Sequence, residues 1–212
     1  MTAPGITRRR LLEGSTAVSV ALVLGACDDD GGGIAQTEAG PRTEAERARL
    51  TPTPACDDGD EPTPSQTEGP FYSTDTPRRR SLLEDGLQGE RLALTGVVVD
   101  TRCRPIPRAL LDFWQADANG DYDTDGYRLR GHQFTDRRGR YRLETIVPAL
   151  YPGRTRHIHV KAQRPGGDVL TTQLYFPGEP SNRDDPIFDA ALLMDVRRAG
   201  AARRARFTFV LV

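Results

Sequence analysis

The sequence is poor in lysine, cysteine and histidine. Lys161 is the only lysine among 29 basic residues, and the chain holds three cysteines and three histidines. Three cysteines are too few for a disulfide scaffold. The formal net charge of −1 excludes a chain that holds nucleic acid through bulk positive charge. The apolar run over residues 15–26 is about a dozen residues long, too short for a membrane helix, which needs roughly 20.

The first 27 residues have the pattern of an export signal. Arg8 and Arg9 precede the apolar run, and the run ends in Leu24-Gly25-Ala26 before Cys27. This order is typical of a twin-arginine signal that ends in a lipoprotein cleavage site. We therefore expect residues 1–26 to be removed and Cys27 to carry a lipid, which would anchor the protein to the outer face of the cell membrane unless it is released. A plain N-terminal helix is the alternative.

A segment with almost no aliphatic residues follows the signal. Residues 28–65 consist largely of Asp, Gly, Thr, Pro and Glu. Such a composition cannot bury enough apolar surface to offset the entropy of ordering. The prediction is a flexible tether over residues 27–62 and one folded domain over residues 63–212.

The odd cysteine count has a simple reading in an exported lipoprotein. If Cys27 carries the lipid, then Cys56 and Cys103 remain, and in an oxidising compartment they would pair with each other. Two free thiols are the alternative.

The domain shows apolar residues at a period of two in short runs, separated by turn sequences. Several short strands at this spacing predict an all-β fold, a single antiparallel β-sandwich with long loops. The spacing of apolar residues in 187–194 predicts one short C-terminal helix. The predicted strands are residues 91–100, 109–115, 140–146, 156–163, 169–176 and 206–212.

His157-Ile158-His159 is the sharpest local pattern. In a strand, residues i and i+2 point to the same face, so both imidazoles would converge while Ile158 faces the core. This arrangement suits a metal ion, although two histidines on a polar strand face are the alternative. His132 is expected to be an ordinary loop residue.

Two histidines do not complete a coordination sphere. No cysteine, aspartate or glutamate lies at a suitable spacing in the strand, but Tyr151 precedes His157 and Tyr122 closes an earlier loop. Tyrosine in such turns is commonly a packing residue. It becomes a ligand when a strong Lewis acid lowers the pKa of its phenol, which favours Fe(III) over zinc if both tyrosines bind.

An ordered set of short motifs resembles the intradiol ring-cleavage dioxygenase family, and in particular the catalytic domain of its protocatechuate 3,4-dioxygenase branch. The resemblance covers roughly residues 63–188, and the set as a whole is far more specific than each piece. The motifs are residues 67–72 (Thr-Glu-Gly-Pro-Phe-Tyr), 114–122, 134–141, 151–154 (Tyr-Pro-Gly-Arg), 157–159 (His-Ile-His) and 173–176 (Gln-Leu-Tyr-Phe).

The resemblance implies a non-haem Fe(III) held by two tyrosinates and two histidines. Its ligands match Tyr122, Tyr151, His157 and His159. Catalytic roles fall on Tyr151, which would leave the metal as a base, and on Arg154 and Gln173 beside it. The implied reaction opens a catechol-type ring with O2 and gives a cis,cis-muconic acid. The expected architecture is a prealbumin-like sandwich.

The sequence departs from the family pattern in two places. It lacks the helical N-terminal dimerisation domain of the catechol 1,2-dioxygenase branch, so the oligomeric state stays open, a dimer included. Gly153 stands where a bulkier residue would line the substrate pocket, which leaves the identity of the catechol open.

Two other functions compete. Residues 96–100, 105–109 and 135–141 also resemble transthyretin-like or carboxypeptidase-regulatory-like sandwiches, which are mostly non-catalytic binding modules. That resemblance explains the scaffold but neither the two histidines nor Arg154 and Gln173. A zinc hydrolase lacks a carboxylate ligand or base near His157.

Overall fold

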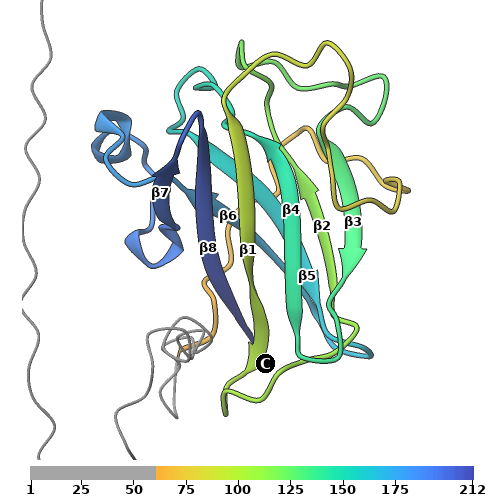
Figure 1. Cartoon of the computed structure of the whole chain (residues 1–212). Helices are drawn as coiled ribbons and strands as arrows, with labels where there is room; N and C mark the ends of the chain where they lie inside the picture. The colour runs from red at the N-terminus through yellow and green to blue at the C-terminus, as the bar shows by residue number, and fades with distance from the viewer. Residues whose placement is uncertain (1–60) are drawn as a thin grey trace, which may run out of the picture. The chain divides into compact units, whose positions relative to one another are not determined.

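A computed structural model describes residues 61–212 (Figure 1). The predicted signal and most of the predicted tether, with Cys27 and Cys56, lie outside these residues, so those predictions are not tested. The described part contains eight strands and two short 3-10 helices, in the order β1 (Arg91–Asp100), β2 (Leu110–Trp114), β3 (Arg130–Phe134), β4 (Arg140–Ile146), β5 (His157–Gln163), β6 (Val169–Tyr175), η1 (Pro180–Arg183), η2 (Ala190–Leu192), β7 (Asp195–Ala199) and β8 (Ala202–Leu211).

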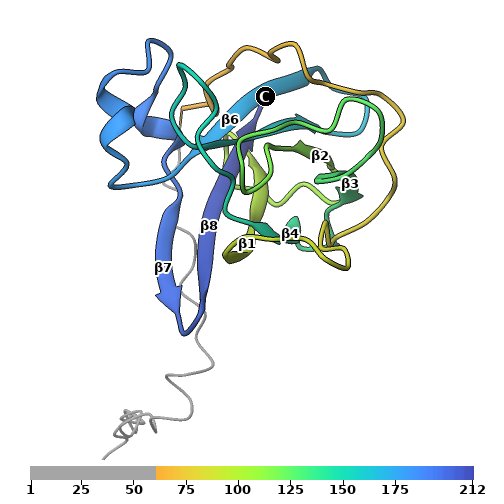
Figure 2. The same ribbon diagram turned by 90° about the horizontal axis from the view of Figure 1, so that it is seen from above.

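The strands form two four-stranded sheets (Figures 1 and 2). One sheet has the order β4-β1-β8-β7 and the other β3-β2-β5-β6, which confirms the all-β class. The prediction of a purely antiparallel arrangement is wrong at one pair, because β1 and β8 run parallel, from Arg91 opposite Ala202 to Asp100 opposite Leu211. No hairpin joins these two strands, so no tight turn fixes their relative direction.

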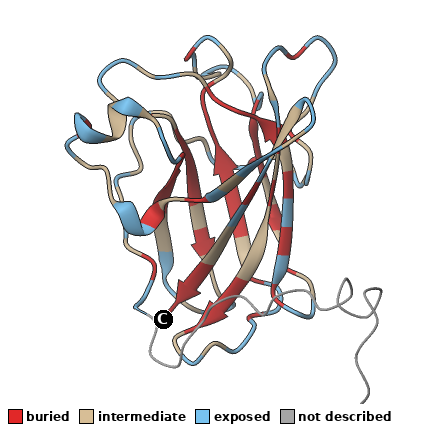
Figure 3. Cartoon of the chain, turned by 60° about the vertical axis from the view of Figure 1, so that its left-hand side comes forward, coloured by how far each residue is buried: buried red, intermediate tan, exposed pale blue. Residues whose placement is uncertain are grey.

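Both sheets contribute alternate side chains to one hydrophobic cluster. Buried residues recur along the strands of both sheets (Figure 3). Removing these side chains from water is the main favourable term in folding, at about 25 cal/mol per Å² of apolar surface. Fully buried members of the cluster include Leu94, Leu143 and Phe209 from the first sheet and Phe113, Ile158, Val160 and Leu174 from the second.

The predicted strands match the structure unevenly. The bounds of β1 and β4 agree with the prediction, and β2, β5 and β6 differ by one residue at an end or at both ends. Strand β8 begins at Ala202, earlier than predicted, and strands β3 and β7 were not predicted. His132 lies in β3, so the expectation of a loop residue is wrong. These two strands, Arg130–Phe134 and Asp195–Ala199, carry few apolar residues and so show no apolar alternation. They become strands by pairing with β2 and β8, respectively.

The predicted helix over residues 187–194 is wrong. Only Ala190–Leu192 forms a 3-10 turn, capped by the Asp189 carboxylate, which accepts a hydrogen bond from the backbone N–H of Ala191. Leu192 and Met194 are buried, whereas Leu193 between them is only partly buried. The N–H of Met194 donates to the carbonyl of Tyr175 at 3.0 Å. The segment therefore continues as extended chain toward β7. Within residues 61–212, no helix is long and apolar enough to span a bilayer.

The segment before β1 connects the two sheets. The N–H of Gln66 donates to the carbonyl of Thr171 in β6, Arg78 forms a parallel bridge with His132 in β3, and Ser81 forms one with Glu144 in β4. Residues 66–72 therefore lie along the outer face of the second sheet, where the predicted histidine pair is found.

Candidate active site

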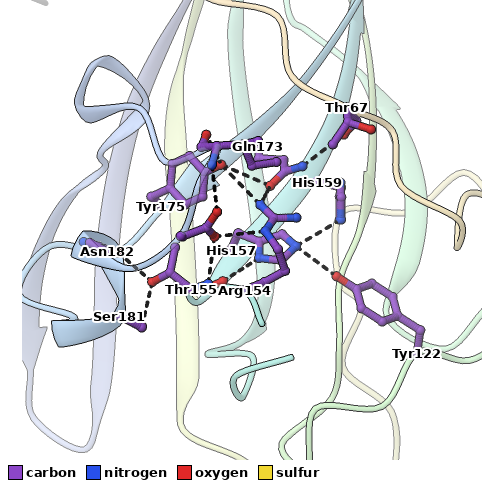
Figure 4. A network of polar contacts seen from close by, with 12 residues as sticks. Thr67, Tyr122, Arg154, Thr155, His157, His159, Gln173, Tyr175, Ser181 and Asn182 are labelled. Atoms are coloured by element: carbon purple, nitrogen blue, oxygen red, sulfur yellow. Dashed lines mark hydrogen bonds and ion pairs between the residues drawn. The ribbon is translucent and has the colours of Figure 1, made fainter. Parts of the chain in front are cut away.

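His157 and His159 share one face of β5, as predicted. In register, His157 lies opposite Tyr175 and His159 opposite Gln173, both in β6. The intervening Ile158 is fully buried in the hydrophobic core. The imidazoles are 4% and 3% exposed, and their Nε2 atoms lie 3.1 Å apart. The pair thus forms a buried, convergent group and not a solvated polar face (Figure 4).

The tautomer of His157 is fixed by the backbone. Its Nδ1 lies 2.6 Å from the carbonyl oxygen of Thr155, which can only accept, so the ring proton is on Nδ1 and the Nε2 lone pair faces the site. Burial lowers the pKa of His157 to about 4 and holds the pKa of His159 well below its usual value of 6.5. Both rings are therefore neutral near pH 7, which is the form that binds metals.

Tyr122 supplies a third donor from the loop between β2 and β3. Its hydroxyl lies 3.2 Å from His157 Nε2, and burial raises the pKa of the phenol well above its ordinary value. Arg130 holds this loop, because its Nε donates to the carbonyl of Asp123 at 3.0 Å and its Nη1 donates to the carbonyl of Phe71. The buried guanidinium thus ties the loop of Tyr122 to the segment that covers it.

Tyr151 lies beside Tyr122, with ring centroids 5.8 Å apart in an edge-to-face arrangement. Its position depends on Gly120, which has a φ of +96° and packs directly on the loop of Tyr151. A Cβ at Gly120 would lie 2.4 Å from the carbonyl oxygen of Leu150. Only glycine accommodates both the left-handed backbone and this close approach. The two predicted tyrosine ligands are thus brought together by a contact between their loops.

Aromatic rings and one glycine enclose the donors. Trp114, opposite His159 in register, stacks on it with ring centroids 4.7 Å apart, and Phe71 stacks on Tyr122 at 4.5 Å. Gly69 lies against the imidazole of His159, where an added Cβ would be 3.5 Å from Cε1. These groups keep water away from the face of the histidine pair, which strengthens electrostatic interactions there.

Arg154 and Gln173 lie together at the edge of this group (Figure 4). Arg154 Nη2 donates to Gln173 Oε1 at 2.6 Å, and the amide of Gln173 donates to the carbonyl of Thr67 at 3.0 Å. Burial is the main reason why the pKa of His157 is low, and the positive charge of Arg154 lowers this pKa further. The guanidinium is therefore close enough to interact electrostatically with a ligand bound next to the histidines.

Asp185 neutralises this arginine. Its buried carboxylate accepts from Arg154 Nε at 2.9 Å and from the backbone N–H of Thr155 at 2.8 Å. Burial by itself would raise the pKa of Asp185, but the backbone hydrogen bonds and the charge of Arg154 outweigh it and lower the pKa. The pair is thus an ion pair at neutral pH.

The donor set fits a metal ion. At most one proton can lie between the two Nε2 atoms, and Nδ1 of His159 has no hydrogen-bond partner within residues 61–212. Two neutral, buried imidazoles whose Nε2 atoms converge at this distance can both direct a lone pair at one cation, which is the arrangement of a metal site. In this described part no cluster of three or more His, Cys, Asp or Glu exists, so any further protein ligand would be a tyrosine.

A cavity of about 390 Å³ opens beside Tyr151, whereas Tyr122, His157 and His159 do not belong to its lining. Its lining includes Leu150, Tyr151, Gly153, Arg154 and Asp185. Its volume is within the range of small-molecule sites. An added Cβ at Gly153 would meet nothing within 4 Å, so this glycine leaves the cavity wall open.

Several contributors had no predicted role. Tyr175 could have been inferred, because it shares a strand face with Gln173, and its hydroxyl donates to Gln173 Oε1 at 3.2 Å. Trp114 and Gly69 belong to the recognised motifs, but their contacts with His159 depend on strand register and on the path of the covering segment. Asp185 lies in a loop after η1 and carries no local sequence signal.

Comparisons with known proteins match this chain to dioxygenases. The family model described as "Dioxygenase" matches residues 67–211. The protocatechuate 3,4-dioxygenase beta chain of Burkholderia cepacia is 39% identical over 118 residues, which are 47% of this chain and 50% of the relative. The hydroxyquinol 1,2-dioxygenase of Rhizobium sp. (strain MTP-10005) is 30% identical over 167 residues, 65% of this chain and 56% of the relative.

A solved structure matches over a comparable stretch. The dioxygenase domain of a dioxygenase carbohydrate-binding protein fusion from the cellulolytic bacterium Streptomyces sp. SirexAA-E is 58% identical, with a TM-score of 0.70 over 71% of this chain and 98% of that domain. The chain spans about half the length of the curated relatives it matches. From the family match and the histidine–tyrosine site it covers, the chain belongs to the intradiol ring-cleavage dioxygenase family.

Proposed function

We propose that the protein is a non-haem Fe(III) dioxygenase that cleaves a catechol between its two hydroxyl carbons and gives a cis,cis-muconic acid. The observation that carries the proposal is the convergence of three donors on His157: its Nε2 lies 3.1 Å from His159 Nε2 and 3.2 Å from the Tyr122 hydroxyl. Tyr151 completes the proposed ligand set. The reaction is balanced, because both oxygen atoms of O2 enter the product.

When bound by two imidazoles and two phenolates, Fe(III) would supply Lewis acidity that draws a catechol into its doubly deprotonated form. The protein must also manage the two protons that the catechol releases. Tyr151 is only half-buried and lines the cavity, which supports its phenolate as the base that would accept one of them. Tyr122, stacked under Phe71, is held more firmly and is expected to stay in place.

Arg154 and Gln173 would act on the substrate by electrostatics. Of the guanidinium nitrogens, Nε and Nη2 are engaged by Asp185, Gln173 and Tyr175, and Nη1 has no hydrogen bond within residues 61–212. This leaves donors for the negative charge that develops on the ring and on the incoming oxygen. Such preorganised donors in a dry site need no reorganisation during the reaction.

The substrate is proposed only as a class. The names of the relatives include protocatechuate, hydroxyquinol and catechol dioxygenases. The open wall at Gly153 supports a catechol that carries a ring substituent, but several substituents fit that description. The non-catalytic binding module has no support from the site, because it gives no reason to bury two imidazoles beside Arg154.

The proposal is tested by iron loading and oxygen uptake. Fe(III) bound to tyrosinate is coloured, so we expect the loaded protein to absorb visible light, to change colour with catechol, and to consume O2 with formation of a muconic acid. Tyr151→Phe should weaken the colour, and Tyr122→Phe should also lower iron content. Loaded protein that is colourless and does not respond to catechol, protocatechuate or hydroxyquinol would defeat the proposal.

The proposal extends to the architecture and the location. The hydrophobic cluster shared by both sheets supports one prealbumin-like sandwich. Arg8-Arg9 and Cys27 support twin-arginine export and lipid anchoring, and with them a role on catechols met outside the cell. If export is unchanged when both arginines are replaced by lysine, the twin-arginine route is wrong.

A further inference from the structure

Asp185 has more contacts to the site than an ordinary surface carboxylate. Its side chain is fully buried. Oδ2 accepts from Arg154 Nε at 2.9 Å and from the Thr155 N–H at 2.8 Å, and Oδ1 accepts from the Ile187 N–H at 3.1 Å. One carboxylate thus joins the loop after η1 to the residues that precede β5.

These contacts determine where Arg154 points. The carboxylate holds the guanidinium at Nε, while Gln173 Oε1 and the hydroxyl of Tyr175 hold it at Nη2, at 2.6 and 3.4 Å. With two of its nitrogens fixed, the planar group has one orientation, and Nη1 is the nitrogen left for a ligand. Figure 4 shows Arg154 within this network, beside His157.

The same carboxylate supports a histidine through one peptide group. The Thr155 N–H donates to Asp185, and the Thr155 carbonyl accepts from Nδ1 of His157 at 2.6 Å. The hydroxyl of Thr155 adds a contact to Asn182 at 2.6 Å, which fixes the residue from the other side. If the carboxylate is replaced by an amide, the contact with Asn182 therefore still holds Thr155 in place. The ion pair with Arg154, in contrast, is lost.

We propose that Asp185 is a positioning residue for ring cleavage, which acts through Arg154 by fixing the guanidinium and balancing its charge. The inference rests on the proposed function. Without the carboxylate, the guanidinium would keep only its contacts at Nη2 and would turn toward solvent, so its N–H groups would no longer face the substrate. Its positive charge would also no longer be balanced by a neighbouring carboxylate.

The test uses the full iron-loaded chain with Asp185→Asn, which keeps the shape and one acceptor but removes the charge. We expect kcat to fall about 10- to 100-fold, the range typical of residues that hydrogen-bond to the residues of a metal site without contacting the metal. We expect KM for catechol, iron content and the visible colour to stay near the wild-type values. Asp168→Asn is the matched control, since Asp168 is exposed in the β5–β6 turn. It should leave all four quantities unchanged.

A double-mutant cycle separates positioning from general support. If Asp185 acts through Arg154, then Asp185→Asn should cost little further activity in an Arg154→Ala background. Multiplied losses in the double variant would overturn the inference, as would loss of iron or colour in Asp185→Asn alone, which would mark a structural role. Asp185→Glu, which restores the charge, should recover part of kcat.

The two proposals fail in different ways. A wild-type protein that binds iron but neither takes up O2 nor changes colour with catechol overturns the proposed function. A wild-type protein that does both, with Asp185→Asn at the wild-type kcat, overturns the role of Asp185 alone.

Discussion

Burial acts in opposite senses on the two kinds of residue at the site. It lowers the pKa of His157 and His159, which favours the neutral imidazole that binds metals, but raises the pKa of Tyr122, which opposes the phenolate. A tyrosine in this position becomes a ligand only to an ion that offsets the cost of ionising it. This is the physical reason why the donor set favours Fe(III) over zinc.

At the same scale, the sequence predicted residues whose role follows from spacing and missed those whose role follows from folding. The period of two in His157-Ile158-His159 requires both imidazoles to share a face. Asp185 reaches Arg154 only because the loop after η1 folds back on the start of β5. The spacing of residues in the sequence does not predict this contact. Loop-borne partners of this kind need the fold before they can be recognised.

Asp100 provides a residue-scale prediction for pH. The side-chain hydrogen bond from Arg104, helped by backbone N–H groups of Arg102 and Arg104, lowers the pKa of Asp100 from its ordinary 3.8 to about 2. The folded-state pKa is below the unfolded value, so the carboxylate stabilises the fold above pH 4 and loses this effect as the pH falls toward 2.

We therefore expect Asp100→Asn to lower Tm by a few degrees at pH 6 and by less at pH 3. Thermal unfolding followed by circular dichroism at both values checks this. Asp168→Asn, which removes a carboxylate without a hydrogen-bonded partner in residues 61–212, should show no such trend. A Tm difference that is the same at both pH values would contradict the assigned pKa.

At the scale of elements, strands with clear apolar alternation were predictable and polar ones were not. Arg140–Ile146 alternates buried with more exposed side chains over most of its length, and Arg91–Asp100 does so at its start; the bounds of both were predicted correctly. Asp195–Ala199 contains three charged residues and becomes a strand by pairing with β8. The short apolar run over 187–194 also shows that helical spacing in a few residues does not distinguish a helix from an extended segment.

The parallel pair of β1 and β8 requires a glycine at position 96. A Cβ there would lie 1.8 Å from the carbonyl oxygen of Phe207 and 2.8 Å from the ring of Tyr141, whose hydroxyl donates to that same carbonyl at 2.9 Å. The ring and the carbonyl fill the space that a side chain would need. Neither can move without breaking the strand pairing or the buried hydrogen bond.

Gly96→Ala is therefore expected to lower the free energy of unfolding by about 3 kcal/mol or more, the upper range for overpacking in a core. Gly166→Ala is the control. It lies in a turn with nothing within 4 Å of an added Cβ, and its φ of +72° should cost only about 1–2 kcal/mol. Urea unfolding compares them, and equal losses would show that backbone strain, not the clash, dominates at Gly96.

At the scale of the whole molecule, Cys103 bears on how the cysteines pair. Cys103 is disulfide-bonded, and the two other cysteines, Cys27 and Cys56, lie outside residues 61–212. Pairing of Cys103 with Cys56 therefore stays a proposal, supported by the expected lipid on Cys27. A disulfide restricts the unfolded chain and typically adds about 2–4 kcal/mol to stability.

Cysteine replacements test the pairing. Cys56→Ser and Cys103→Ser should each lower the free energy of unfolding by about 2–4 kcal/mol, and the double variant should lose no more than either one. Cys27→Ser should leave this free energy unchanged. If Cys27→Ser matches Cys103→Ser instead, Cys27 is the partner and the lipid anchor on it is ruled out.

The parallel contact of β1 with β8 also bears on how the protein is made. The first and last strands of residues 61–212 lie side by side in the middle of one sheet. Contacts between segments so distant in sequence slow folding, because the chain between them must close into a loop first. While the polypeptide is still being synthesised, β1 lacks this neighbour and exposes an unpaired edge. Closure of this sheet is therefore a late step of biosynthesis, and a chaperone that shields β1 until β8 has been synthesised is expected to raise the yield of native protein.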